Sequence, residues 1–385
     1  MVIDSSVDGH ACGGLRYFAD VRLEKIRALA RGMTLKYGFS GMAQGGAKAG
    51  IVADASEPLG IKHRRLRRFG ELIAPLLRSR YYISGPDMGT TDEDTKVMLE
   101  AAGMSIPRRR QRKGKKSGFF TALGVMVSIE ACVEYLGKDL SKCSIAIQGF
   151  GSVGSALAHL LKARYGSKVV AISTVEGALF DPKGLDVDRL LTLFATSGSK
   201  LIDLYPGGQR IPPEGLALMD VDILSPCAYQ YAVNLDNATQ ISAPILCPGA
   251  NNPVTRSAEK ILFERGILSV PYFVANCGGV LGNMIEMLDL SDGDIETVLR
   301  RKNKQRVLQL LRTSHSQGRT MTDIAEEYAL QRFRTMRQNG RKKGLAKYAR
   351  MIAVRAFNAG LLPNAILRPF RRAYLKKALL TDPPI

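Results

Sequence analysis

One glycine-rich turn constrains the fold of this 385-residue chain more than any other feature. The segment 148–154 (Gln-Gly-Phe-Gly-Ser-Val-Gly) follows the apolar run 143–148 and precedes an apolar-periodic segment that ends at Lys162. A second run of β-branched residues, 168–173, completes a strand–helix–strand unit of about thirty residues. Such units build parallel sheets that carry helices on both faces. We therefore predict an α/β chain that contains a doubly wound Rossmann domain.

The same turn predicts a dinucleotide-binding site. In this pattern the first glycine allows the tight turn, the second lets a pyrophosphate approach the backbone, and the third lets the helix pack closely on the strand. The N-terminus of the helix adds partial positive charge beside the phosphates. The predicted cofactor-binding residues are Gly149, Phe150, Gly151, Ser152, Val153 and Gly154.

The choice between NAD and NADP depends on the end of the second strand. An acidic residue usually stands there and binds the ribose 2′-hydroxyl of NAD, but the expected position here holds Thr174. A hydroxyl does not repel the additional phosphate of NADP, whereas a carboxylate does. Glu176 lies two residues further on and would restore a preference for NAD if it took that place. The sequence leaves both cofactors open.

The composition is that of a globular chain. Hydrophobic residues make up 45% and charged residues 23% of the sequence, and the length favours two domains. No uninterrupted apolar run reaches eighteen residues, and the first six residues lack the basic region and apolar core of a secretory signal. Six cysteines without a CxxC pair and only four histidines argue against a zinc site or a disulfide framework. We expect a cytoplasmic protein with no metal site and no membrane span.

The formal net charge of +20 predicts attraction to polyanions. The excess of lysine and arginine is concentrated in 62–68, in 108–116 and in the tail 341–385. The segment 107–116 begins with Pro107 and contains Gly114, as exposed loops often do. The basic loop and tail predict a weak contact with nucleic acid or an anionic surface. The alternative, which we favour for the tail, is a solvated segment that packs on a neighbouring subunit.

Periodic patterns predict further elements on both sides of the turn. Thr91 suits the N-cap of one of these helices, because three acidic residues follow it in the first turn. We expect the glycines of 45–50 to end the first helix and a strand to begin at Ile51. Helices are predicted over 21–36, 66–77, 91–102 and 117–136, and strands over 81–83, 221–224 and 243–246.

Short motifs occur in a recognisable order along the chain. They are Gly13-Gly14-Leu15-Arg16, Met33-Thr34-x-Lys36, Gly45-Gly46-Ala47-Lys48, Asp87-Met88-Gly89-Thr90, the turn 149–154, Gly249-Ala250-Asn251-Asn252 and Asn276-Cys277-Gly278-Gly279-Val280. With these motifs, the chain from about Gly9 to about Gln338 resembles the Glu/Leu/Phe/Val dehydrogenase family of amino-acid dehydrogenases. The resemblance implies a homo-oligomer and the following order of domains: an α/β substrate domain (1–120), a Rossmann NAD(P)-binding domain (121–305), and C-terminal helices with a basic tail (306–385).

The resemblance also implies roles for individual residues. Lys36 would bind the α-carboxylate of an amino acid, Lys48 would be the catalytic lysine that activates water, and Asp87 would carry a proton to and from the substrate nitrogen. The implied reaction is NAD(P)-dependent oxidative deamination to a 2-oxo acid and ammonium. Further positions expected to contact the substrate or the cofactor are Gly14, Thr121, Asn251, Asn276 and Val280.

Two positions bear on the side chain of the substrate. Members of the family that act on glutamate carry a lysine just before the first Gly-Gly, where this chain has Cys12, and a serine where it has Asn283. Without that cation, the side-chain carboxylate of glutamate would be desolvated and unpaired. We therefore predict a neutral L-amino acid as substrate, with glutamate as the alternative. A relative that binds nucleotide and polyanion without turnover is a second alternative. Relatives usually carry several tens of residues before the segment that matches Val2, so we expect either an upstream start or a shortened substrate domain.

Overall fold

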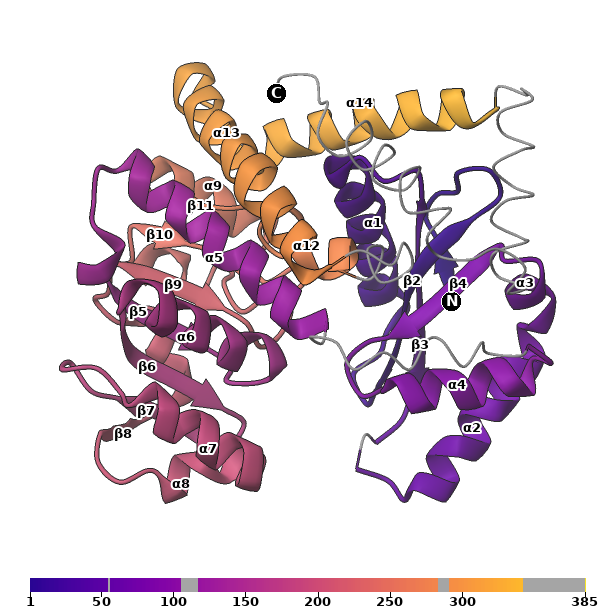
Figure 1. Cartoon of the computed structure of the whole chain (residues 1–385), viewed down its shortest axis with the longest axis horizontal. Coiled ribbons are helices and arrows are strands. Elements are labelled where there is room, and N and C mark those ends of the chain that lie inside the picture. Colours follow the sequence, from indigo (N-terminus) through magenta and orange to yellow (C-terminus); the bar gives the residue numbers. More distant parts are fainter. Residues whose placement is uncertain (55, 105–116, 283–290, 342–384) are drawn as a thin grey trace. The chain divides into compact units, whose positions relative to one another are not determined.

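The structure is a computed structural model that describes residues 1–54, 56–104, 117–282, 291–341 and 385 (Figure 1). The predicted basic loop 107–116, the tail from residue 342 to 384, and Asn283 lie outside the described residues. By their internal contacts, the described residues form two compact units. The first unit holds residues 1–104 and 328–341, and the second unit holds residues 117–327 and 385. The predicted domain boundaries at residues 120 and 305 stay predictions.

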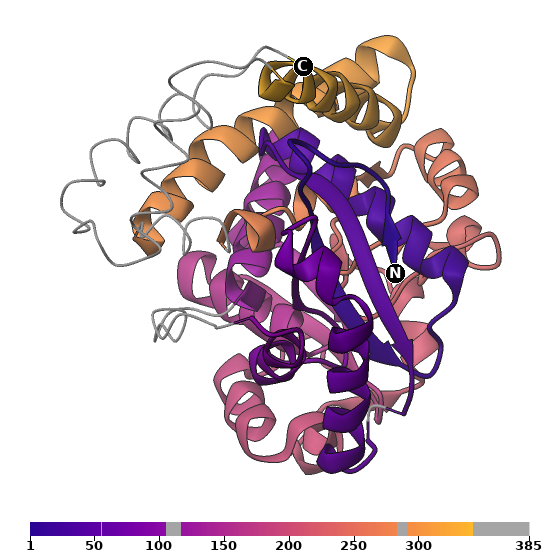
Figure 2. The ribbon, with the colours of Figure 1, turned by 90° about the vertical axis from the view of Figure 1, so that its right-hand side faces the viewer.

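The first unit is built on a sheet of indigo and violet strands (Figure 2). The strand order of this sheet is β1-β3-β2-β4. Strand β2 (Ala11–Phe18) is parallel to both of its neighbours, β3 (Gly45–Val52) and β4 (Tyr82–Pro86), whereas β1 (Val2–Ile3) is antiparallel to β3. On one face, alternate strand residues such as Leu15 and Ala49 form a core with Leu66 and Met98. The helices of this unit are α1 (Leu23–Ser40), α2 (Leu59–Leu72), α3 (Ala74–Arg78), α4 (Asp92–Ala101) and the end of α14 (Met321–Arg341).

Two predictions about this unit were wrong in detail. The glycines of 45–50 do not form a loop, because β3 begins at Gly45 and the predicted start at Ile51 is near its end. Helix α1 instead runs on to Ser40 and ends at Gly41, whose φ of 74° is left-handed. The predicted helix 66–77 is two helices, since α2 ends at Leu72 and α3 begins at Ala74 with a proline in its first turn.

The second unit contains the predicted Rossmann sheet, with the strand order β11-β10-β9-β5-β6-β7-β8. Its parallel strands are β5 (Ser144–Gln148), β6 (Lys168–Thr174), β9 (Ile223–Pro226), β10 (Ile245–Leu246) and β11 (Leu268–Ser269), extended antiparallel by β7 (Gly177–Phe180) and β8 (Gln209–Ile211). Helix α6 (Ser152–Tyr165) connects β5 to β6, which confirms the predicted strand–helix–strand unit. The doubly wound α/β fold class is thereby confirmed.

Further helices cover this sheet. They are α5 (Ser117–Tyr135), α7 (Val187–Ser197), α8 (Leu201–Leu204), α9 (Arg256–Glu264), α10 (Tyr272–Ala275), α12 (Asp292–Val298) and α13 (Lys304–Gln317). Short 3-10 turns span Leu140–Lys142, Gly198–Lys200, Pro213–Leu218 and Ala238–Gln240, and a π-helical turn spans Leu299–Asn303. Among the described residues, only α5 is long and apolar enough to cross a membrane, and 67% of its most apolar stretch, Gly118–Tyr135, is buried in the protein. Its apolar residues are therefore accounted for by the core.

Candidate functional site

One face of the first-unit sheet is lined largely by glycine. Side chains alternate along a strand, and the register pairs Cys12 with Gly46 and Arg16 with Gly50. Helix α1 covers this face. A Cβ on Gly46 would lie 2.3 Å from the backbone nitrogen of Thr34, and one on Gly50 would lie 2.7 Å from Ile26. The glycines therefore let α1 approach the sheet, and they leave only a few side chains on this face.

Three of those side chains form a compact charged cluster. The carboxylate oxygen Oδ2 of Asp87 lies 3.0 Å from Lys48 Nζ and 3.1 Å from Arg16 Nε. The exposed fractions of the Lys48, Arg16 and Asp87 side chains are 5%, 7% and 14%. Burial by itself would raise the pKa of Asp87, but the charges and hydrogen bonds of Lys48 and Arg16 outweigh it and lower the pKa below its usual value. Asp87 is therefore an ionised carboxylate held between two cations.

The turn that carries Asp87 is bonded to the neighbouring strand β2. The Thr90 hydroxyl donates to the carbonyl oxygen of Leu15 at 2.7 Å and accepts from the backbone nitrogen of Asp87 at 2.9 Å. Gly89 has a φ of 79°, and a Cβ there would lie 1.9 Å from the carbonyl oxygen of Tyr17. Only glycine fits this position. The position of the Asp87 carboxylate is thus determined by its backbone as well as by its ion pairs.

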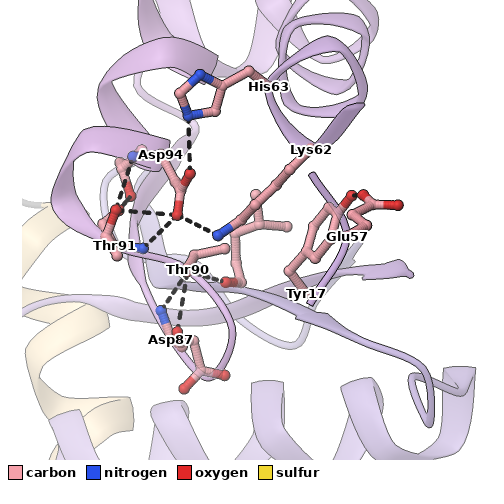
Figure 3. A network of polar contacts seen from close by, with 10 residues as sticks. Tyr17, Glu57, Lys62, His63, Asp87, Thr90, Thr91 and Asp94 are labelled. Atoms are coloured by element: carbon pink, nitrogen blue, oxygen red, sulfur yellow. Dashed lines mark hydrogen bonds and ion pairs between the residues drawn. The ribbon is translucent and has the colours of Figure 1, made fainter. Parts of the chain in front are cut away.

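Thr91 is the N-cap of α4, as the sequence predicted, and it forms a capping box with Asp94 (Figure 3). Asp94 accepts from the backbone nitrogen of Thr91 at 2.9 Å, and its carboxylate also lies 2.7 Å from Lys62 Nζ and 3.3 Å from His63 Nε2. Lys62 and His63 belong to the first basic segment, 62–68. Because both pair with a buried carboxylate on α4, this part of the segment ties α2 to α4 and presents less charge to solvent than the sequence suggests.

Lys36 and Cys12 also lie on buried parts of the first unit. Lys36 is on α1 and is 6% exposed. The thiol of Cys12 hydrogen-bonds the Tyr37 side chain, and burial followed by this thiol raises the pKa of Tyr37 above its ordinary value. The Tyr82 hydroxyl, which belongs to the core with Ala11 and Leu15, donates to the carbonyl oxygen of Gly13 at 2.9 Å. The immediate surroundings of Cys12 thus include the uncharged side chain of Tyr37.

In the second unit, the predicted dinucleotide turn connects β5 to α6. Gly149 has a φ of 100°, and a Cβ there would lie 2.8 Å from the Cβ of Ala228. A Cβ on Gly154 would lie 2.0 Å from the carbonyl oxygen of Gly149, whereas one on Gly151 would contact nothing within 4 Å. Gly151 is the N-cap of α6 and offers no side-chain cap to its first N–H groups. These groups suit a phosphate.

The other residues of the turn differ in what they expose. Phe150 is 2% exposed and packs edge-on against Phe194, so its side chain belongs to the core. Ser152 is exposed at the start of α6, and Val153 lies against Gly249. The turn itself is bonded to β6, because Ser173 accepts from the backbone nitrogens of Gly149 and Phe150. Strand β5 lies between β6 and β9, so the turn stands where the sheet changes its winding direction, which is the usual ligand site of such folds.

Thr174 is the last residue of β6, as the sequence predicted. Its hydroxyl donates to the carbonyl oxygen of Ser199 at 3.0 Å and accepts from the backbone nitrogen of Glu176 at 3.1 Å. Val175 and Glu176 form the exposed connection between β6 and β7. The end of β6 therefore carries the Thr174 hydroxyl, which is hydrogen-bonded to the backbone. The carboxylate of Glu176 lies two residues further on, in the turn to β7.

A cluster of amides follows the carboxyl ends of β5 and β10. Asn276 is 2% exposed, and its Nδ2 donates to Gly249 O at 3.2 Å, to Ala250 O at 3.1 Å and to Asn251 Oδ1 at 3.0 Å. Two buried acceptors, Asn276 Oδ1 and Gln148 Oε1, have no partner among the described residues. These acceptors, the uncapped helix N-terminus and the open space at Gly151 fit a bound dinucleotide.

Close backbone packing brings the Asn276 segment to α5. A Cβ on Gly278 would lie 1.8 Å from the carbonyl oxygen of Phe120, which immediately precedes Thr121. Val280 is half-buried two residues further along. The structure thus groups Cys12, Gly14, Lys36, Lys48 and Asp87 in the first unit, and the turn 149–154, Thr121, Thr174, Asn251, Asn276 and Val280 in the second.

The sequence patterns predict no role for Arg16, although it lies in the motif Gly13-Gly14-Leu15-Arg16. The period-two alternation of Ala47, Ala49 and Ile51 with Gly46, Lys48 and Gly50 was the available signal, because it indicates a strand with a glycine face. A strand at that place would have put Lys48 on the same face as its neighbours on β2. The contact between Arg16 and Asp87 spans 71 residues and has no local signature.

Comparison with known proteins identifies the family. Residues 1–104 match the family described as "Glu/Leu/Phe/Val dehydrogenase, dimerisation domain", and residues 116–340 match "Glutamate/Leucine/Phenylalanine/Valine dehydrogenase". Glutamate dehydrogenase of Thermotoga maritima is 35% identical over 291 residues, which cover 72% of this chain and 69% of the relative.

Solved structures of amino-acid dehydrogenases share the fold. Hetero-hexameric glutamate dehydrogenase from Thermus thermophilus, in its Leu-bound form, matches with a TM-score of 0.75 and 25% identity, covering 88% of this chain and 83% of that chain. L-tryptophan dehydrogenase from Nostoc punctiforme matches with a TM-score of 0.61 and 25% identity, covering 87% and 91%. The chain belongs to the Glu/Leu/Phe/Val dehydrogenase family and is an amino-acid dehydrogenase.

Proposed function

We propose that this chain catalyses the NAD(P)-dependent oxidative deamination of a neutral L-amino acid to a 2-oxo acid and ammonium. The observation that carries the proposal is the buried contact of Lys48 with Asp87 on the glycine-lined face of the first unit. A lysine and an ionised carboxylate at 3.0 Å are two groups that can each take up and return a proton, as amine oxidation requires. The dinucleotide turn of the second unit accounts for the redox partner.

Binding of the substrate is assigned to Lys36 and to the glycine face. A buried ammonium is a compact point charge that suits the α-carboxylate. Gly14 is assigned to the substrate contact, because a Cβ there would lie 2.9 Å from the Cβ of Asp87 and the position is therefore beside the proposed proton carrier. Thr121, Asn276 and Val280 are assigned to the substrate and nicotinamide region from the second unit.

The proton transfers are assigned to Asp87 and Lys48. When bound, NAD or NADP accepts the hydride that leaves the substrate Cα. Asp87 first takes a proton from the substrate ammonium, so that the nitrogen lone pair assists the loss of hydride. Lys48 in its neutral form then takes a proton from water, whose oxygen bonds to the imine carbon. Asp87 returns its proton to the nitrogen, the carbon–nitrogen bond breaks, and the departing ammonia takes the proton of the carbinolamine hydroxyl, which leaves the 2-oxo acid and ammonium. Lys48 then releases the proton that it took from water to the solvent.

Cys12 supports a neutral side chain. Burial raises the pKa of the neighbouring Tyr37 hydroxyl, which therefore carries no charge at neutral pH, so a substrate carboxylate placed beside it would be desolvated without a counter-charge from it. The similarity to glutamate dehydrogenase of Thermotoga maritima favours glutamate as the second candidate. Which side chain is accepted is therefore decided by a comparison of substrates.

The test is cofactor reduction, followed as absorbance at 340 nm, with NAD and NADP supplied separately and a panel of L-amino acids that includes glutamate. We expect turnover with a neutral amino acid and loss of at least about 1,000-fold in kcat for Lys48→Ala. Lys96→Ala removes an exposed lysine of the same unit, which is paired to Glu93, and should leave kcat unchanged. Undiminished deamination by Lys48→Ala would refute the assigned role, and faster turnover of glutamate would refute the neutral preference.

A further inference from the structure

Arg16 contacts the carboxylate of Asp87, and no step assigned above uses it. Its Nε donates to Asp87 Oδ2 at 3.1 Å, and Lys48 Nζ lies 3.0 Å from the same oxygen. Both cations therefore converge on one oxygen of the carboxylate.

The two cations differ in chemistry. A lysine loses its proton when it acts as a base, whereas an arginine keeps its charge at any pH that a protein tolerates. If Lys48 becomes neutral to take a proton from water, Arg16 is the permanent positive charge that remains at Oδ2. A buried carboxylate without any counter-charge would tend to take up a proton and keep it.

The strand β2 is built to hold this contact in place. A Cβ on Gly14 would lie 2.9 Å from the Cβ of Asp87, so glycine at that position lets the Asp87 backbone come close to β2. The residues on either side of Arg16 hold the same turn, because Leu15 accepts from the Thr90 hydroxyl at 2.7 Å and the Tyr17 nitrogen donates to Met88 O at 3.0 Å. Arg16 and Asp87 are thus fixed on one rigid backbone frame.

We propose that Arg16 is a positioning residue that keeps Asp87 ionised between turnovers and holds its carboxylate at β2, where it exchanges a proton with the substrate nitrogen. This inference rests on the proposed function of Asp87. Arg16 also has a second effect. Because its permanent charge favours the ionised form of Asp87, the proton that Asp87 takes from the substrate returns readily to the leaving nitrogen.

The experiment measures the titration of Asp87 itself. Infrared difference spectroscopy follows the protonated-carboxyl band that Asp87→Asn abolishes, and the pH profile of kcat/KM is recorded on the same proteins. Arg16→Gln keeps a hydrogen-bond donor but removes the charge. In this variant the pH at which half of the Asp87 carboxyl is protonated should rise by about 1–3 units. Arg16→Lys keeps the charge and should recover most of that shift. An unchanged midpoint in Arg16→Gln would overturn the proposal.

Two further variants complete the design. Arg78→Gln removes a cation of the same unit whose Nε donates to the carbonyl oxygen of Ala102, and it should leave the Asp87 midpoint unchanged. In Lys48→Ala, Arg16 alone must keep Asp87 ionised at pH 7; a carboxyl band already present at that pH would overturn the proposal even if Arg16→Gln does not fold. The infrared midpoint does not depend on turnover, so failure of the proposed function, seen as deamination that survives Lys48→Ala, is distinguished from failure of this inference.

Discussion

Cys12 is the residue on which the proposed substrate class depends. It lies on the glycine face of β2, in register with Gly46, and hydrogen-bonds a buried tyrosine. Its position in the motif is the one at which glutamate-specific relatives are expected to carry a lysine. A single substitution should therefore shift the preference between charged and neutral side chains.

We predict that Cys12→Lys raises kcat/KM for glutamate relative to a neutral amino acid by about tenfold or more, which corresponds to about 1.4 kcal/mol of differential binding. The introduced ammonium would pair with the side-chain carboxylate. Cys12→Met, which adds length without charge, is the matched control and should not improve glutamate. The measurement is the 340 nm assay with both substrates; an equal response of both variants would contradict the charge argument.

At the end of β6, Thr174 is the residue on which the choice between NAD and NADP depends. Its hydroxyl bonds the backbone of Ser199, and its replacement by aspartate places a carboxylate at the strand end. We predict that Thr174→Asp lowers kcat/KM for NADP by about tenfold or more, because like charges about 4 Å apart repel by about 1–4 kcal/mol at a protein surface. Thr174→Ser keeps the hydroxyl and should behave like the natural chain. If the ratio of kcat/KM for NAD to kcat/KM for NADP does not change, the ribose 2′-group of the cofactor does not bind beside residue 174.

At the scale of elements, the packing of α1 on β3 depends on glycine. A Cβ on Gly46 would lie 2.3 Å from the backbone nitrogen of Thr34, so Gly46→Ala must displace the helix that carries Lys36. We predict a loss of about 2–3 kcal/mol in the free energy of unfolding, measured by urea denaturation. Gly60→Ala on α2 meets nothing within 4 Å and is the control, expected to be neutral or to stabilise by about 0.5–1 kcal/mol. Equal stability of both variants would refute the close approach of α1.

The contact of α9 with α14 makes stability depend on pH. Glu259 is buried, and burial raises its pKa to about 7, although the Thr322 hydroxyl and Arg256 oppose the shift. A carboxyl with a raised pKa binds its proton more tightly in the folded state, so its contribution is full below the unfolded pKa of about 4.3 and is lost as the pH rises to about 7.

We predict that Glu259→Gln, which still accepts the hydrogen bond of Thr322, removes this loss and is more stable than the natural chain at pH 8. The difference should be at most about 4 kcal/mol, from about 1.4 kcal/mol for each unit between the unfolded pKa of about 4.3 and the folded pKa of about 7, and it should vanish near pH 4. Urea denaturation at several pH values measures it. Glu264→Gln changes an exposed carboxylate on the same helix as a control. A difference that stays constant with pH would contradict the assignment to Glu259.

At the scale of the whole molecule, charge is unevenly distributed along the chain. Ten lysines and arginines and one aspartate follow Arg341, so nearly half of the net charge of +20 lies in the tail. On α2, by contrast, Lys62 pairs with Asp94, Arg65 with Glu57 and Arg68 with Glu71. Local acidic partners thus reduce the basic character of the segment 62–68, whereas the tail sequence contains little compensating charge.

We predict that the full chain binds a heparin column and that a chain ending at Gly340 elutes at a clearly lower salt concentration, because fewer counterions are exchanged. Light scattering on the same two proteins reports whether the homo-oligomer needs the tail. Unchanged elution would show that the tail makes no polyanion contact. If only the oligomer changes, the favoured alternative, packing on a neighbouring subunit, is supported.

The local sequence patterns determined the types of element and several of their ends. The turn 148–154 with its flanking apolar runs predicted β5, α6 and β6, and Thr91 with the acidic residues after it predicted the cap of α4. These features are encoded within a few residues, since glycine conformations, helix caps and apolar periodicity act over short distances. The family resemblance then supplied Lys36, Lys48 and Asp87 as site residues.

Only the tertiary structure decided what those residues touch. We expected the glycines of 45–50 to end the first helix and the strand to begin only at Ile51, because glycine is disfavoured in isolated strands. They form β3 instead, and the approach of α1 leaves no room for a Cβ on Gly46 or Gly50. Arg16 was found only through its contact with Asp87, 71 residues further along the chain. Strand register and helix packing bring segments together that lie far apart in the sequence, and a local sequence pattern cannot predict which segments pair.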